Sequence, residues 1–183
     1  MPITPETITK WITGRTTKNP PRLLHFPCGD GQRTEAIAKA LNCQAYGADP
    51  NEQNIKIAKE RLQSAEVADI HKLRIAPDRC LHMLWLDPGT YLVHAALKNL
   101  QSTLVTDYLL ILHLNRAQIT LPVIRWLLAN SGDYRIRRVT IDKDSSIVIL
   151  ASYRPQEEDL DATPASQLLS SVDSSALYQA FPF

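Results

Sequence analysis

The stretch Leu23-Leu24-His25-Phe26-Pro27-Cys28-Gly29-Asp30-Gly31-Gln32-Arg33-Thr34 decides the fold of this chain. A helical run over Glu35 to Leu41 follows it, and a second extended run over 44–48 ends at Asp49-Pro50. Strand, glycine turn, helix and second strand, with an acid roughly twenty positions after the glycines, form the layout of a nucleotide-binding βαβ half. Gly29 and Gly31 lack a Cβ and let the backbone approach a ligand, while Asp49 can accept hydrogen bonds from both hydroxyls of a ribose. The sequence therefore predicts a site for a nucleoside-like cofactor.

Each of these residues also has an ordinary structural interpretation. A Gly-x-Gly pair occurs in many turns, and Asp49 could instead cap the helix that follows it. His25 could line the mouth of a pocket or be a strand-end histidine whose hydrogen bonds are satisfied within the fold. The order of strand, glycines, helix and acid favours a binding site over a structural turn.

The remaining sequence alternates between apolar extended runs and helical patterns. Leu81 to Leu86 and Tyr108 to Leu114 are typical of buried parallel strands, and the first of them ends at the turn Asp87-Pro88-Gly89-Thr90. Two consecutive runs, 134–141 and 146–153, predict a β-hairpin. Helices are expected over 51–63, 92–104 and 121–130, with weak extended signals at 66–70 and 72–75. The fold predicted is an α/β, Rossmann-like, doubly wound and mostly parallel sheet with a terminal antiparallel hairpin.

Three segments are expected along the chain. Residues 1–21 hold a short amphipathic helix over 4–12 and a connector, residues 22–154 form the α/β domain, and residues 155–183 form a flexible tail. The tail is rich in Ser, Gln, Asp and Glu, which bury too little apolar surface to offset the entropy of ordering. Phe181-Pro182-Phe183 at its end is the exception, and predicts docking on this domain or on a protein partner.

Composition narrows the class of protein. The 183 residues are 44% hydrophobic with a net charge of +1, which neither demands nor excludes a nucleic-acid partner. The three cysteines have no disulfide or zinc spacing, and the histidines have no metal-ligand spacing. No leader and no apolar run long enough to span a bilayer is seen, so we expect a cytoplasmic protein with no membrane association and no metal.

Four motifs carry a resemblance to a known family over about Leu23 to Arg154. They are the loop 27–31, Asp49, Asp69 and the turn 87–91. With the terminal hairpin, they resemble class I S-adenosylmethionine-dependent methyltransferases, and most of all the adenine amino-methyltransferases that act on nucleic acid. The resemblance implies S-adenosylmethionine as cofactor, with binding residues His25, Pro27, Gly29, Gly31, Asp49 and Asp69. It also implies the catalytic residues Asp87, Pro88 and Tyr91.

In that family an Asn or Asp side chain and a proline carbonyl accept hydrogen bonds from the adenine amine, and an aromatic ring stacks on the flipped base. This chain departs from the pattern. His25 replaces the acid that usually ends the first strand, and Pro27 stands at the first glycine position. Gly89 replaces the second proline, and Thr90 occupies the aromatic position, with Tyr91 displaced by one.

Two functions follow from the resemblance. The first is S-adenosylmethionine-dependent methylation of adenine in DNA or RNA. The second is a catalytically inactive methyltransferase fold, a pseudoenzyme that serves as a binding or scaffolding subunit. A third interpretation, a nicotinamide-dependent oxidoreductase, shares the βαβ start but fits the terminal hairpin poorly.

Overall fold

The computed structural model describes residues 20–75, 81–118, 120, 122–123, 126, 135–141 and 147–152. Its strands form one seven-stranded sheet in the order β3-β2-β1-β4-β5-β7-β6. The elements are β1 (Arg22–Phe26), α2 (Gln32–Leu41), β2 (Gln44–Asp49), α3 (Glu52–Ala58), β3 (Ser64–Val67), β4 (Leu81–Leu86), α4 (Val93–Leu100), η2 (Gln101–Thr103), β5 (Leu104–Leu114), η3 (Arg116–Gln118), β6 (Arg135–Ile141) and β7 (Ile147–Ser152).

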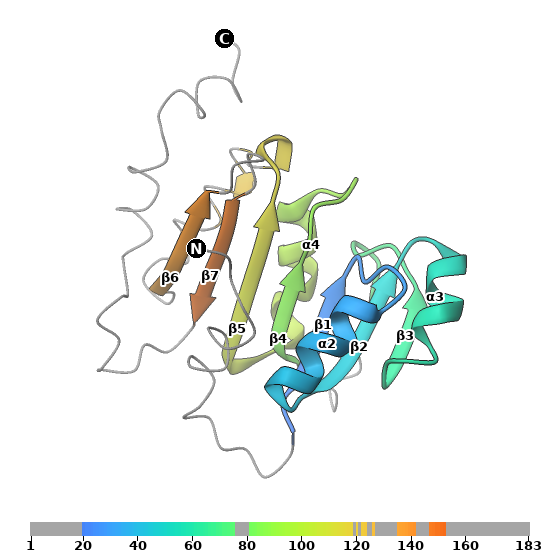
Figure 1. Cartoon of the computed structure of the whole chain (residues 1–183). Coiled ribbons are helices and arrows are strands. Elements are labelled where there is room, and N and C mark those ends of the chain that lie inside the picture. The colour runs from blue at the N-terminus through green and yellow to red at the C-terminus, as the bar shows by residue number, and fades with distance from the viewer. Residues whose placement is uncertain are drawn as a thin grey trace.

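The five strands β3, β2, β1, β4 and β5 are parallel, and β7 runs antiparallel between β5 and β6 (Figure 1). Parallel strands need crossover connections, which α2, α3 and α4 supply. The predicted doubly wound sheet with a terminal antiparallel hairpin is confirmed.

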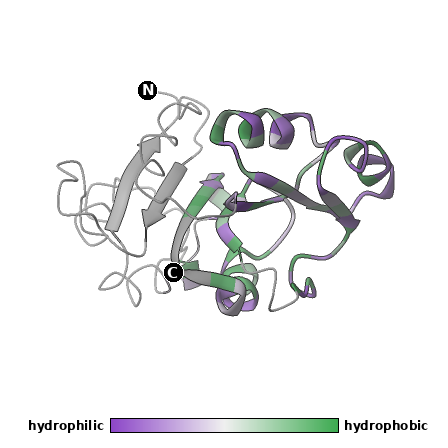
Figure 2. Cartoon of the chain, turned by 90° about the horizontal axis from the view of Figure 1, so that it is seen from below, coloured by the Kyte–Doolittle hydropathy of each residue, from purple (hydrophilic) through white to green (hydrophobic). Residues whose placement is uncertain are grey.

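Helices lie on both faces of the sheet (Figure 2). Because side chains alternate along a strand, β1, β4 and β5 each contribute to two cores. The cluster on the α2 face consists of Leu23, Ile37, Leu41, Met83, Trp85 and Ile111. The larger cluster on the α4 face includes Leu24, Phe26, Leu84, Leu86, Leu97, Leu110 and Leu112. Strands covered on both faces explain the continuous apolar runs in the sequence.

Several predicted boundaries were wrong. Helix α3 ends at Ala58 rather than near residue 63, because the Gln63 amide donates to the Ala45 carbonyl at 2.9 Å and draws the chain into the sheet. Strand β3 consequently begins at Ser64, two residues before the expected extended run, and residues 72–75 form no strand. Helix α4 gives way at Leu100 to the short 3₁₀ turn η2.

Some expectations lie outside the described residues. These are the helix over 4–12, most of the helix over 121–130, and the tail 155–183 with Phe181-Pro182-Phe183. The domain boundaries proposed from the sequence, and a protein partner bound through the tail, therefore stay predictions. Over the part of the chain that the structure describes, no helix combines the length and apolar character needed to cross a bilayer.

Candidate functional site

The glycine loop connects β1 to α2 at the carboxyl edge of the sheet. Gly29 and Gly31 adopt φ values of 57° and 81°, in the left-handed region that favours glycine. A Cβ on Gly29 would meet no atom within 4 Å, whereas one on Gly31 would lie 3.2 Å from Ala58 and from Leu62. Gly31 therefore permits close packing of α2 against α3, and Gly29 borders open space that a ligand can approach.

Asp49 ends β2 and holds this loop. Its Oδ2 accepts the Gly29 amide at 2.9 Å, and its Oδ1 accepts the Asn51 amide at 2.8 Å and the Asn54 side-chain amide at 3.2 Å. The helix cap is Asn51, whose side chain accepts from the amides of Gln53 and Asn54. A carboxylate has about four lone-pair sites, so Asp49 keeps room for about one further donor. Two ribose hydroxyls would both bind there only if one of the present donors moved.

Asp69 lies in the loop that follows β3, at the same edge of the sheet, with its side chain exposed. Its Oδ1 accepts the amide of His71 at 2.9 Å. The His71 Nε2 in turn accepts the Leu92 amide at 3.4 Å, so His71 links this loop to the loop after β4. The structure thus brings Gly29, Asp49 and Asp69 to the ends of three neighbouring strands, as predicted for a ligand site in an open α/β sheet.

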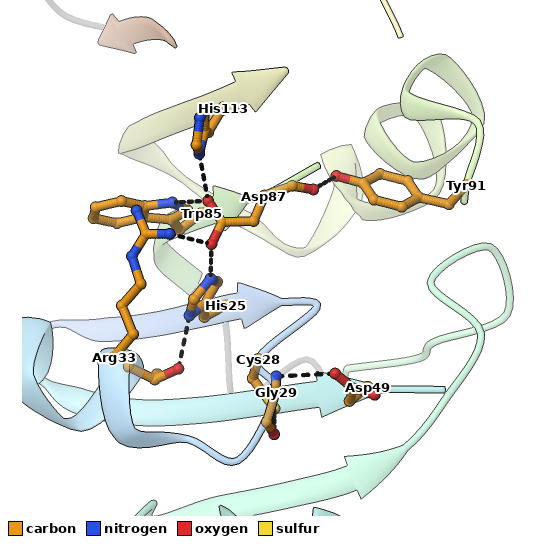
Figure 3. Close-up of polar contacts among 10 residues, drawn as sticks. His25, Cys28, Gly29, Arg33, Asp49, Trp85, Asp87, Tyr91 and His113 are labelled. Atoms are coloured by element: carbon orange, nitrogen blue, oxygen red, sulfur yellow. Dashed lines mark hydrogen bonds and ion pairs between the residues drawn. The ribbon is translucent and has the colours of Figure 1, made fainter. Parts of the chain in front are cut away.

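Asp87, directly after β4, is the centre of a polar network on the α2 face of the sheet (Figure 3). Its Oδ2 accepts from His25 Nε2 and Arg33 Nη1, both at 2.8 Å. Its Oδ1 accepts from Trp85 Nε1 at 2.9 Å and His113 Nδ1 at 3.0 Å. His25 is 1% exposed, and its Nδ1 lies 2.7 Å from the Thr34 hydroxyl. The four donors come from β1, α2, β4 and β5.

The network fixes the charge of Asp87. Burial alone would raise the pKa of this carboxyl, but hydrogen bonds from His113 and His25 and the charges of His25 and Arg33 hold the pKa well below its usual range. Four donors also occupy about all of the lone-pair sites of the carboxylate. As arranged, Asp87 is an ionised acceptor at neutral pH with no capacity left for a substrate amine.

The loop after Asp87 closes on itself through Tyr91. The Tyr91 hydroxyl donates to the Asp87 carbonyl at 2.5 Å, and its ring meets the ring of Phe26 edge-on at 5.1 Å. Burial, followed by the charge of Asp87, raises the pKa of Tyr91 well above its usual range. A Cβ on Gly89 would lie 3.0 Å from the Tyr91 ring and 3.6 Å from Pro27. Tyr91 is therefore packed into the domain, and the base-stacking role implied by the resemblance stays a prediction.

Sequence reasoning missed most of the partners of Asp87. Arg33, Trp85 and His113 are not among the site residues predicted from the sequence. A signal was present, because Trp85 and Asp87 are two residues apart and so face the same side of the chain, as do Ile111 and His113. Polar residues that follow apolar residues on the same face, near the carboxyl ends of several strands, indicate that these residues lie together in one polar network.

The described residues also include a cavity, potential metal ligands and the buried cysteine Cys28. A cavity of about 200 Å³ is lined by residues that include Tyr46, Glu66 and Arg74, and none of the predicted site residues lines it. No three His, Cys, Asp or Glu side chains within the described ranges gather as metal ligands. Burial raises the pKa of the Cys28 thiol to about 12, so this cysteine of the glycine loop is a poor nucleophile.

Comparisons with known proteins agree with this architecture. A family model described as a methyltransferase domain matches residues 24–80, which contain the end of β1, the glycine loop and Asp49. A solved S-adenosylmethionine-dependent methyltransferase from Listeria monocytogenes, itself described as putative, aligns with a TM-score of 0.59 at 13% identity, over 81% of this chain and 99% of that one. The fold is that of class I methyltransferases.

Two further structures extend the comparison. An rRNA methylase from Streptococcus thermophilus aligns with a TM-score of 0.62 at 9% identity, over 85% of this chain and 99% of that one. The plantazolicin methyltransferase BpumL, solved with a pentazolic desmethylPZN analogue and SAH, aligns with a TM-score of 0.50 at 21% identity, over 68% of this chain. This chain spans 49% of the length of BpumL. No curated protein sequence matches the chain.

Proposed function

We propose that this protein binds S-adenosylmethionine at the carboxyl ends of β1, β2 and β3. The observation that carries the proposal is the bond between Asp49 and the Gly29 amide, which places an ionisable acceptor beside the open space at Gly29. The glycine loop and Asp49 also lie inside the segment that matches the methyltransferase domain.

The residues present fit such a cofactor. Asp49 retains acceptor capacity for about one ribose hydroxyl. Asp69 is an exposed carboxylate in the loop after β3, the strand next to β2. When bound, S-adenosylmethionine supplies a methyl group on a positively charged sulfur. The glycine loop would orient it with its backbone, because Gly29 leaves space where any other residue would place a Cβ.

Calorimetric titration with S-adenosylmethionine and with its demethylated product tests this proposal. Asp49→Ala should weaken binding by about 1–3 kcal/mol, the value of a charge-assisted hydrogen bond. Glu52→Ala is the control, since Glu52 is an exposed acid on the neighbouring helix α3 that pairs with Lys56. Equal affinities for the wild type and Asp49→Ala would remove Asp49 from the site, and absence of binding to the wild type would refute the proposal.

The reaction proposed from the resemblance is methyl transfer to the amine of adenine in DNA or RNA. Its support is positional, because Asp87 and Pro88 follow β4, the strand next to the glycine-loop strand β1. The Pro88 carbonyl would accept from the amine, and Asp87 would do so only after releasing one of its four donors. Proximity and orientation would supply most of the rate.

A specific observation favours the second candidate, a cofactor-binding subunit without catalysis. The side chain of Asp87 is fully engaged, and its carbonyl accepts from Tyr91, so the turn assigned to catalysis is bonded within the protein. The assay is transfer of tritiated methyl from S-adenosylmethionine to single-stranded and duplex DNA and to RNA. Transfer by the wild type would establish the enzyme. Cofactor binding without transfer would support the subunit.

A further inference from the structure

The order of the strands gives the proposed cofactor site a direction. Asp69 follows β3 and Asp49 ends β2, so the nucleoside part of the cofactor belongs on that side of the sheet. Next in the sheet come β1 and then β4. If the proposed function is correct, the amino-acid part of S-adenosylmethionine extends over β1 toward the network around Asp87.

Arg33 lies on that side and is held in a defined place. It is the second residue of α2, its Nη1 donates to Asp87 at 2.8 Å, and its guanidinium carbon lies 5.1 Å from the centre of the Trp85 ring. The side chain is nevertheless 53% exposed. A guanidinium carries five N–H donors in a planar fork, so one edge is used by Asp87 while the other can face a ligand (Figure 3).

The network is rich in donors and short of acceptors. Among the described residues, one carboxylate accepts hydrogen bonds from Arg33, His25, Trp85 and His113. A second anionic acceptor would therefore be stabilised here.

We propose that Arg33 binds the α-carboxylate of the methionine part of S-adenosylmethionine, and that Asp87 is a positioning residue that holds Arg33 against Trp85. A carboxylate and a guanidinium match in two parallel hydrogen bonds. The role gives a reason for an exposed arginine to be fixed by both an ion pair and a ring contact. It also gives Asp87 a task that does not require it to touch a methyl acceptor.

Two ligands separate this role from cofactor binding in general. S-adenosylhomocysteine carries the amino-acid carboxylate, whereas 5′-methylthioadenosine has the nucleoside and thioether without it. Calorimetry should show that Arg33→Gln weakens the affinity for S-adenosylhomocysteine by about 10- to 100-fold, the value of a charge-assisted contact. The same variant should change the affinity for 5′-methylthioadenosine by less than about twofold. Arg33→Lys, which keeps the charge and loses the fork, should fall between the wild type and Arg33→Gln.

Arg61→Gln is the matched control. Arg61 also donates to an aspartate, Asp30, at 2.8 Å, but Asp30 belongs to the glycine loop and not to the network of Asp87. This variant should leave the ratio of the two affinities as in the wild type. An unchanged affinity of Arg33→Gln for S-adenosylhomocysteine, or an equal loss for both ligands, would overturn the proposal for Arg33. Binding of neither ligand to the wild type would refute the proposed function and the role of Arg33 with it.

Discussion

Replacing Asp87 by asparagine should destabilise the protein far more than the small change in shape suggests. Asparagine keeps one acceptor oxygen but presents an NH₂ group to donors that now bond to the second carboxylate oxygen. Each carboxylate oxygen accepts from one buried donor, His25 on Oδ2 and Trp85 on Oδ1. These two residues are 1% and 5% exposed, so whichever oxygen the NH₂ group replaces, one buried donor loses its acceptor and water cannot replace it. The contact with Arg33 is discounted because that side chain is 53% exposed.

The magnitude follows from the buried donors. A hydrogen bond to a charged group is worth about 1.5–3 kcal/mol, and breaking a buried ionic cluster by removing one partner costs about 3–5 kcal/mol. Because asparagine retains one acceptor, we expect a loss of about 3 kcal/mol in the free energy of unfolding at pH 7. The assay is urea denaturation followed by tryptophan fluorescence. Asp30→Asn is the control, since Asp30 is bonded to an arginine in the same way but has a 44% exposed side chain.

The difference in stability between the wild type and Asp87→Asn should depend on pH. The pKa of Asp87 is lowered in the folded protein, so its contribution is complete above the unfolded value of about 3.9 and is lost as pH falls toward the folded pKa. The difference between wild type and Asp87→Asn should therefore be constant from pH 7 down to about 4 and shrink below that. A variant within about 0.5 kcal/mol of the wild type at pH 7 would show that the network does not stabilise the fold.

Three further predictions follow from single contacts. Gly31→Ala should lower the free energy of unfolding by about 2–3 kcal/mol, because a positive φ is combined with a Cβ 3.2 Å from Ala58, whereas Gly29→Ala should lower it by only about 1 kcal/mol and should mainly weaken S-adenosylhomocysteine binding. Urea denaturation measures the first effect and calorimetry the second, and equal losses of stability in the two variants would contradict the packing role of Gly31. Tyr91→Phe should cost about 1 kcal/mol by removing the bond to the carbonyl after β4, and a neutral result in the same denaturation assay would show that this bond does not fix the turn. The Cys28 thiol, with its pKa raised to about 12, should resist iodoacetamide at pH 8 in the native protein and react in urea, as peptide mapping would reveal; rapid labelling of the native protein would show that the glycine loop opens.

The parts of the fold that the sequence predicted are those set by local chemistry. An apolar run, two glycines and an amphipathic helix specify the first βα unit from neighbouring residues alone, and Asp49 falls at the strand end by counting residues. Strand β4 was predicted at its observed bounds, because its apolar run is closed by Asp87-Pro88. The end of α3 was missed, since it depends on a bond from Gln63 to a carbonyl of β2 that no local pattern reveals.

The sequence placed the candidate residues near strand ends but did not reveal their hydrogen bonds, and that they form a binding or catalytic site stays a prediction. The resemblance implies a role for Asp87, but its partners His25 and His113 are 62 and 26 residues away along the chain. Only the sheet order, which sets β1 and β5 on either side of β4, brings them to one carboxylate. Strand order is a tertiary property, so single-sequence reasoning could place each residue at the edge without knowing which side chains meet.

Three positions at which this chain differs from the motif it resembles, His25, Gly89 and Tyr91, are linked by contacts in the structure. The acid expected at the end of β1 is His25, and the carboxylate it lacks is supplied across the sheet by Asp87. The backbone carbonyl of Asp87 accepts a hydrogen bond from the Tyr91 hydroxyl. The Tyr91 ring packs against Gly89, where the absence of a Cβ leaves room for it. A proline at position 89 would crowd the Tyr91 ring from 3.0 Å. Restoring the motif at positions 89 and 90 alone would therefore leave Asp87 bound to His25, Arg33 and His113, and we expect a gain of methyl transfer to require an acid at position 25 as well.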